Sequence, residues 1–172
     1  VAECAREAES DITVITNLIE SRLITGDKGL YEAMRAATSP TEIWPSDAFF
    51  EAKCKEQLAR WKKYGETAYN LEPNIKENPG GLRDIQTIIW VAKRHLDVND
   101  LFELQNQNLL TADEFEDLLE GRNFLWQVRF GIHIIAGRRE DRLLFDHQKK
   151  LAELLGYQDD EHSLAVEKMM QT

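Results

Sequence analysis

The residues best suited to chemistry in this chain are charged side chains gathered around a pair of glycines. The charged residues are Lys76, Glu77, Arg83 and Asp84, and the glycines are Gly80 and Gly81. Glycine lets the backbone turn sharply and approach a neighbour closely. Just beyond the pair, the first-turn N–H groups of a helix would lack carbonyl partners and carry partial positive charge. Together with the two cations, these groups could receive the oxygens of a phosphate or a carboxylate.

The same residues also fit a turn with a purely structural role. A glycine pair commonly makes a tight entry into a helix, and Asp84 in a first turn interacts favourably with the helix dipole. Arg83 would then pair with a surface carboxylate. The segment lacks the Gly-Lys-Ser/Thr ending of a P-loop and the Gly-x-Gly-x-x-Gly spacing of a dinucleotide fold, so neither mechanism applies. On the residues alone, the structural interpretation is favoured.

The elements that must position this segment are predicted to be helices. Apolar residues recur at helical spacing along most of the chain, which favours an all-α fold, an irregular helical bundle of about seven or eight helices. The expected helices cover residues 2–25, 28–37, 46–64, 80–96, 100–107, 111–136, 146–155 and 161 to the C-terminus. Between Glu66 and Pro79 the periodicity vanishes, so we expect a loop there, with one short strand around Ala68–Leu71.

Three of these helices carry features that we assign to the core. The stripe of the first helix is Ile12, Ile15, Ile19 and Leu23, and Gly26 can end it. In the helix 46–64, with Ser46 as N-cap, the apolar residues on one side are Phe50, Cys54, Leu58 and Trp61. His133 lies on the longest helix, which opens with a capping box at Thr111. Because no Cys or His stands at ligand spacing from it, we interpret His133 as a hydrogen-bonded interior residue.

The length of 172 residues suits one domain with a real core, so we predict a single helical domain over residues 1–172. Its parts are the N-terminal helices (1–65), the glycine-pair loop with its helix (66–96) and the C-terminal helices (97–172). Val1 directly precedes the first expected helix, with no initiator methionine and no secretory or transit pattern. We therefore expect a fragment of a larger protein.

Composition and charge narrow the classes of partner. The formal net charge of −10 argues against a nucleic-acid partner, since such binders neutralise phosphates with a basic face. No apolar run is long enough to cross a bilayer, so no membrane partner is expected. Cys4 and Cys54 are the only cysteines, which excludes a disulfide framework and favours a reducing cytoplasm as the location.

Charges of both signs gather in a second window near residue 140. The cations are Arg138, Arg139, Arg142, Lys149 and Lys150, and the carboxylates beside them are Glu140, Asp141 and Asp146. Such mixed clusters are usually solvated faces with weak ion pairs.

Three segments carry a resemblance to a known family. They are AREAESDITVITNLIESRLITGD at the start, EPNIKENPGGLRDIQTIIW around the glycine pair and AGRREDRLLFDHQKKLAELLGY after residue 135. They resemble, in this order, the region that follows the nucleotidyltransferase domain in the bifunctional uridylyltransferase/uridylyl-removing enzymes of the PII nitrogen-signalling protein. The resemblance covers essentially all 172 residues.

The resemblance implies a part in the transfer of UMP from UTP to a tyrosine hydroxyl of PII. The helical domain would pack beside the nucleotidyltransferase domain of the same polypeptide and complete its active-site cleft. Lys76 and Arg83 would contact triphosphate or pyrophosphate oxygens, and the glycines would permit close backbone approach. Glu77 or Asp84 would orient these cations or touch substrate. Possible secondary positions facing the cleft are Arg138 and Arg142.

Departures from the full family pattern remove the catalytic groups from this chain. Such transferases place a Gly-Ser turn before two carboxylates spaced one apart, which hold metal ions at the triphosphate. Asp159 and Glu161 have the spacing but no Gly-Ser, so we interpret them as a solvated turn. The uridylyl-removing activity needs an adjacent His-Asp pair, and none of the four histidines precedes Asp. We therefore expect no catalytic or metal-binding residue here, Mg²⁺ bound outside the fragment, and an inactive fragment.

Two alternatives remain open. The adenylyltransferase that modifies glutamine synthetase has a related Lys-x-x-x-Gly-Gly-hydrophobic-Arg-acid-Ile segment, matched here by Lys76 to Ile85. The lead Glu72–Asn74 and the later LLFDHQ segment favour the uridylyltransferase. In a different class, the chain could be a structural helical spacer or a protein-docking module, whose glycine pair fastens it to the catalytic domain without touching nucleotide.

Overall fold

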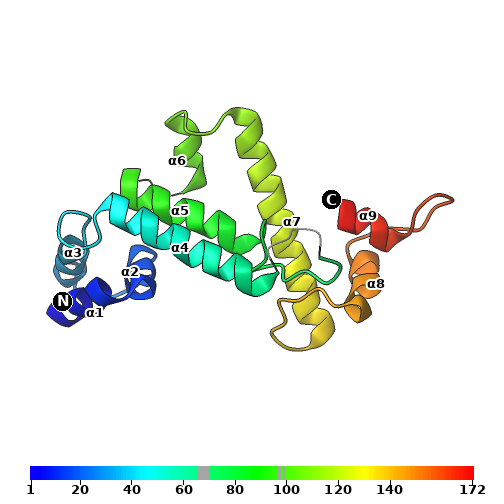
Figure 1. The fold of residues 1–172 in the computed structure, drawn as a ribbon, viewed down its shortest axis with the longest axis horizontal. Helices are drawn as coiled ribbons and strands as arrows, with labels where there is room; N and C mark the ends of the chain where they lie inside the picture. The colour runs from blue at the N-terminus through cyan, green and yellow to red at the C-terminus, as the bar shows by residue number, and fades with distance from the viewer. Residues whose placement is uncertain (66–69, 97, 99) are drawn as a thin grey trace. The chain divides into compact units, whose positions relative to one another are not determined.

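The computed structural model describes residues 1–65, 70–96, 98 and 100–172, and these residues form an all-α fold, as predicted (Figure 1). Nine helices lie within the described ranges. They are α1 (Ala2–Ser10), α2 (Ile12–Ile19), α3 (Lys28–Ala37), α4 (Ser46–Tyr64), α5 (Leu82–Leu96), α6 (Leu101–Asn106), α7 (Ala112–Ala136), α8 (Phe145–Leu154) and α9 (Ala165–Gln171). Across the same ranges, no helix is long and apolar enough to cross a membrane.

The count exceeds the expected seven or eight because the first expected helix is divided at Asp11. This residue is extended, with φ −133° and ψ 115°, and its carboxylate accepts from the N–H of Thr13 at 2.6 Å. An aspartate that bonds to the backbone two residues on competes with helix continuation and caps a new helix. The helix then ends at Ile19. The prediction of one helix running to Thr25 and ended by Gly26 is therefore wrong.

The described chain divides into two compact units, each built from two separate stretches of sequence. Unit 1 comprises residues 1–59 and 86–115, and unit 2 comprises residues 60–85 and 116–172. Each unit contains residues from before and after the glycine pair, so stretches far apart in the sequence share a unit.

The core of unit 1 joins α1, α2, α4 and α5 through Ala8, Ile15, Phe49 and Trp90. Phe49 is fully buried, whereas Phe50 and Leu58, on the face expected to be apolar, are 52% and 62% exposed. The buried face of α4 therefore lies one position from the predicted face.

A buried lysine accounts for this shift in α4. Lys53, one helical turn after Phe49, is 2% exposed. Its ammonium lies 4.5 Å from the ring centroid of Trp90 and 2.7 Å from the carboxylate of Glu56. An apolar stem with an ammonium over an aromatic face can be buried. Hydrophobic spacing does not identify such a residue.

The core of unit 2 packs α7 against α8, and it includes residues at both ends of the glycine-pair loop. Ile75 and Leu82 are buried together with Val128, Ile132 and Leu151. A Cβ on Gly131 would lie 2.3 Å from Leu151 Cδ1, so this glycine permits the close approach of the two helices. The loop is therefore anchored in the core that it borders.

Several sequence-predicted boundaries are confirmed. α3 and α4 have the expected limits, and α7 begins after Thr111, whose hydroxyl and backbone N–H both bond to Glu114. The expected strand falls partly on Ala68 and Tyr69, which lie outside the described residues, and Asn70 and Leu71 are not in a strand. A single antiparallel bridge joins Asn74 to Arg142 instead.

The last helix begins later than predicted, at Ala165 rather than near Glu161. The acidic residues before it form a turn, as expected, in which Asp160 accepts from the N–H groups of His162 and Ser163. Asp159 accepts from the N–H of Ala165 at 2.7 Å. These carboxylates therefore satisfy the backbone before α9.

Candidate functional site

Two asparagine side chains shape the loop that carries the predicted site in unit 2. The amide oxygen of Asn74 accepts from the N–H groups of Lys76 and Glu77, at 3.1 and 2.8 Å. The amide oxygen of Asn78 accepts from the N–H of Asn74 at 2.8 Å, while its NH₂ donates to the carbonyl of Tyr64 at 3.2 Å. Asparagine commonly makes such turns. The sequence analysis assigned neither residue a role, although the turn preference of asparagine is visible in the sequence.

The loop itself occupies N–H groups in the first turn of α5. The N–H of Leu82 donates to the carbonyl of Ile75 at 3.0 Å, and the N–H of Arg83 donates to that of Lys76 at 2.9 Å. The expectation that these groups lack carbonyl partners is therefore wrong. Any anion held at this segment would be held by side chains.

The glycine pair explains why the loop can fold back over the start of α5. Gly80 has a φ of +79°, a conformation that L side chains rarely adopt. A Cβ on Gly81 would lie 2.8 to 2.9 Å from the carbonyl oxygens of Ile75, Lys76 and Asn78. The close approach predicted from the glycines thus exists, and it is made to the chain's own loop.

Asp84 is engaged by an arginine of α4 rather than by Lys76 or Arg83. Its carboxylate pairs with Arg60 and accepts from the indole N–H of Trp61 at 3.2 Å. It also accepts from the N–H of Gly80 at 2.8 Å. The side chains of Arg60 and Asp84 are 8% and 14% exposed. Arg60 is not among the residues predicted from the sequence, because nothing in the spacing of residues relates it to the glycine pair.

Glu77 lies among three cations. Its carboxylate oxygens are 3.4 Å from Lys76 Nζ, 3.6 Å from an Arg83 guanidinium nitrogen and 3.9 Å from Arg60 Nε. The last nitrogen is buried and makes no hydrogen bond within the described residues. Lys76 and Arg83 remain 18% and 24% exposed. Glu77 therefore lies within ion-pair distance of both predicted cations, Lys76 and Arg83.

The loop is tied to the segment after α7 by backbone hydrogen bonds. The N–H of Ile75 donates to the carbonyl of Asp141, and the N–H of Leu143 donates to that of Pro73, both at 2.8 Å. The side-chain amide of Gln148 adds a bond to the carbonyl of Leu71 at 2.7 Å. Two of the segments that carry the family resemblance are thus brought side by side.

Asp141 forms a second charged cluster beside the loop. Its carboxylate accepts from Arg129 at 2.7 Å and lies 3.4 Å from His133 Nε2. Burial alone would raise the pKa of Asp141, but the Arg129 bond, the His133 bond and the charge of Lys76 hold that pKa below its ordinary value. His133 is hydrogen-bonded, as predicted, although its side chain is 30% exposed.

The two possible secondary positions have different surroundings. Arg142 donates to the carbonyl of Glu72 at 3.3 Å and lies 3.5 Å from its carboxylate, so it contacts the lead of the loop. Arg138 is 69% exposed and pairs with Glu140 at 2.9 Å. No contact joins Arg138 to the loop in the described part of the chain. The structure therefore brings Arg142, and not Arg138, to the predicted site.

The donor set of the loop suits an anion better than a metal ion. Both carboxylates, Glu77 and Asp84, already face cations. Over the described ranges, no group of three His, Cys, Asp or Glu side chains could hold a metal ion. Lys76 and Arg83 keep partial exposure and a shared orienting carboxylate, an arrangement that can position phosphate oxygens.

Comparison with known proteins gives a consistent result. The model of a family described as GlnD PII-uridylyltransferase matches residues 48–172. A bifunctional uridylyltransferase/uridylyl-removing enzyme of Stutzerimonas stutzeri is 55% identical over 171 residues, and those of Methylococcus capsulatus and Azotobacter vinelandii are each 52% identical. The alignments cover 99% of this chain and 19% of each relative, so the chain spans about a fifth of their length. No solved structure matches the chain.

Proposed function

Because the chain belongs to the PII-uridylyltransferase family, we propose that it is the helical part of an enzyme that transfers UMP from UTP to the PII signal protein. In this proposal it packs beside the nucleotidyltransferase domain of the same polypeptide and completes the cleft where UTP and PII meet. The identity of 52 to 55% with bifunctional uridylyltransferases supports this over the adenylyltransferase alternative.

The observation that carries the proposal is the placement of Lys76 and Arg83. Both are partly exposed and both face Glu77. Lys76 belongs to a loop anchored in the core of unit 2, and Arg83 belongs to the first turn of α5, which follows that loop. Held in this way, two cations lose little conformational freedom when they receive phosphate oxygens. Arg142, through Glu72, holds the entry to the same loop.

These cations would stabilise charge that moves during the transfer. The tyrosine oxygen forms a bond to the α-phosphorus of UTP, the bond to pyrophosphate breaks, and the hydroxyl proton passes to a base outside this chain. Negative charge builds up on the departing pyrophosphate, which fixed cations stabilise. Since the carboxylates of the loop are engaged by cations, we assign Mg²⁺ to ligands outside this chain. On this proposal the 172-residue chain alone is inactive.

The test replaces the two cations in the full-length enzyme. Lys76→Ala and Arg83→Ala should each lower kcat/KM for uridylylation about tenfold or more, because each removes a charge from the phosphate oxygens. Thermal unfolding should stay near wild type, since both side chains are partly exposed. Wild-type rates for both variants would refute the assignment.

Arg138→Ala is the matched control. It removes one exposed cation of unit 2 that pairs with a carboxylate two residues away. If Arg138→Ala lowers the rate as much as Arg83→Ala does, the loss of activity results from the change in net charge and not from the position of Arg83 at the site.

A second candidate function, a structural junction that fastens the domain, is favoured by one set of observations. The backbone N–H groups of Leu82 and Arg83 and the carboxylate of Asp84 are all satisfied within the chain. Crystals of a catalytic-plus-helical protein soaked with UTP and Mg²⁺ separate the two functions. Electron density for phosphate beside Lys76 supports the transferase role, and nucleotide bound elsewhere supports the junction.

A further inference from the structure

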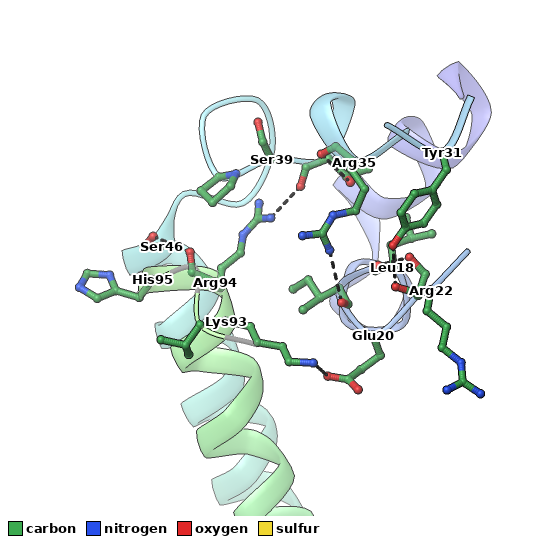
Figure 2. Close-up of a pocket in the computed structure, with 15 residues that line it drawn as sticks. Leu18, Glu20, Arg22, Tyr31, Arg35, Ser39, Ser46, Lys93, Arg94 and His95 are labelled. Carbon is green, nitrogen blue, oxygen red and sulfur yellow. Dashed lines mark hydrogen bonds and ion pairs between the residues drawn. The ribbon is translucent and has the colours of Figure 1, made fainter. Parts of the chain in front are cut away.

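A polar cavity of about 830 Å³ lies within unit 1, between α2, α3 and the C-terminal end of α5 (Figure 2). Its volume is in the range of small-molecule sites. Among its described lining side chains, four are positively charged at neutral pH, namely Arg22, Arg35, Lys93 and Arg94, and one is a carboxylate, Glu20. This balance is unexpected in a chain whose formal net charge is −10.

The carboxylate of Glu20 already forms an ion pair with Lys93. Lys93 Nζ lies 2.8 Å from Glu20, and Figure 2 shows this pair at one side of the cavity. Among the described residues, no carboxylate lies within ion-pair distance of Arg22, Arg35 or Arg94. Arg35 donates to the carbonyl of Ile19 at 3.5 Å, the limit of a hydrogen bond.

Arg94 is buried in the cavity wall and held by carbonyl oxygens. It is 5% exposed, and it donates to the carbonyl of Thr38 at 2.7 Å, to that of Trp44 at 2.9 and 3.0 Å, and to that of Ile43. Each of its three guanidinium nitrogens makes at least one of these bonds, yet carbonyls carry only partial charge, so the guanidinium charge is not cancelled. The ring of Phe49 lies against it, 5.9 Å from centroid to guanidinium carbon.

Arg35 and Arg94 face the same space, and no carboxylate of the described residues lies between them. Figure 2 shows both guanidinium groups in the middle of the cavity, while Arg22 lies toward its edge. Burial, the larger cause, and the charge of Arg35 together lower the pKa of Arg94 to about 10. Two like charges in one partly enclosed space repel each other, and a bound anion would remove that repulsion.

We propose that this cavity binds a small, multiply charged anion of the phosphate-ester or pyrophosphate class, clasped by Arg35 against the fixed charge of Arg94. The anion's oxygens accept from Arg35, which reorganises from its long bond to Ile19, and Arg22 adds attraction at the edge. A long polyanion such as nucleic acid is disfavoured by the charge of the whole chain. Every lining residue belongs to unit 1, so this site shares no residue with the loop around Lys76.

The test measures pyrophosphate binding to the 172-residue chain by calorimetry at low salt. Wild type should bind with a saturable isotherm, and Arg35→Gln should weaken the affinity about tenfold, the loss typical of one charge-assisted contact. Arg22→Gln should weaken it less, because that side chain lies at the edge. Added salt should weaken binding in wild type more than in Arg35→Gln.

Nuclear magnetic resonance provides a second measurement, whose result would not change with pyrophosphate if Arg35 and Arg94 had only a structural role. Pyrophosphate should shift the Nε–H signal of Arg94 in wild type, although that N–H keeps its bond to the carbonyl of Trp44. In Arg35→Gln the same shift should appear only at higher pyrophosphate concentration. A shift confined to residues outside the cavity would overturn the proposal.

Two control variants separate this site from other cations. Arg138→Gln removes one exposed arginine of unit 2 and should leave the affinity unchanged. The double variant Lys76→Ala/Arg83→Ala removes the proposed nucleotide contacts and should leave the Arg94 signal responsive. Absence of saturable binding in wild type, or an equal loss in Arg35→Gln and Arg138→Gln, would overturn the proposal while leaving the proposed transferase role intact.

Discussion

Unit 1 and unit 2 each hold an arginine whose side chain is largely enclosed, and the groups that face its charge differ between the two units. In unit 2 the side chain of Arg60 is 8% exposed and pairs with the carboxylate of Asp84. In unit 1 Arg94 is 5% exposed and donates to three backbone carbonyl groups. A carboxylate brings a full opposite charge, whereas a carbonyl brings only part of one.

This difference indicates that the charged groups of unit 2 are suited to hold cations in position and that those of unit 1 are suited to bind an anion. In unit 2, Glu77 and Asp84 offset the charges of the surrounding cations, so Lys76 and Arg83 are held in place before any ligand arrives. In unit 1, Arg35 and Arg94 share a cavity with no carboxylate of their own in the described chain. The first arrangement suits cations that must be ready for a reaction, and the second suits a cavity that is completed by an anion.

The largest expected effect comes from removing the carboxylate that faces the buried arginine of unit 2. Asp84→Asn should lower the free energy of unfolding by about 3 kcal/mol, because Arg60 keeps its buried charge and an amide NH₂ replaces one acceptor oxygen. Glu20→Gln is the matched change in unit 1, where the carboxylate is 45% exposed and pairs with Lys93, so its cost should stay below about 1 kcal/mol. Urea unfolding measures both.

Equal losses in these two variants would contradict the comparison. They would mean that the carboxylate of Asp84 does not compensate a buried charge, and the oriented state of the neighbouring cations would need another explanation.

The second prediction tests whether the close packing of the loop against Gly81 stabilises the part of unit 2 that carries Lys76 and Arg83. Gly81→Ala should lower the free energy of unfolding by about 2 kcal/mol, because the added Cβ would meet three carbonyl oxygens at 2.8 to 2.9 Å. Gly121→Ala is the control, since that helical glycine has no atom within 4 Å of its Cβ position and should gain up to about 1 kcal/mol. Thermal unfolding of the two variants gives the comparison, and destabilisation by Gly121→Ala of the same size would refute the packing argument.

The smallest expected effect is a pH dependence of the free energy of unfolding that arises in unit 2 and not in unit 1. The pKa of Asp141 in unit 2 is below its ordinary value of 3.8, so the stability from its bonds to Arg129 and His133 is present above that value and is lost as pH falls through the folded-state pKa. Asp141→Asn should remove this part of the acid sensitivity, on the order of 1 kcal/mol. Arg94, held by carbonyl groups, adds no such dependence in acid.

Urea unfolding of wild type and Asp141→Asn at neutral pH and near pH 3 measures the difference. If the variant loses as much stability in acid as wild type does, the Asp141 cluster contributes nothing to it.

The local features of the fold could be predicted because they depend on neighbours a few residues away. The capping box at Thr111, the limits of α3 and α4, and the turn before α9 are examples. The division at Asp11 was missed, although an aspartate that caps its own next turn is also a local signal. The buried face of α4 was missed for a different reason, since Lys53 is buried through Trp90, a residue of another helix.

The candidate site divides in the same way. The glycine pair, its turn and the cations beside it are visible in the sequence, and the structure confirms the close backbone approach at Gly81. The partners of these residues are not visible. Asp84 pairs with Arg60 across 24 positions, and Arg142 contacts Glu72 across 70.

By itself, the sequence determined that this protein is helical, where its chain turns sharply, and which family it resembles. Only the tertiary structure decided that the N–H groups of Leu82 and Arg83 are occupied, that Glu77 pairs with two cations and that Arg35 and Arg94 line one cavity. The physical reason is the distance along the chain over which each interaction acts. Helix propensity and turn chemistry act between near neighbours, whereas the compensation of a buried charge depends on whichever groups packing brings beside it.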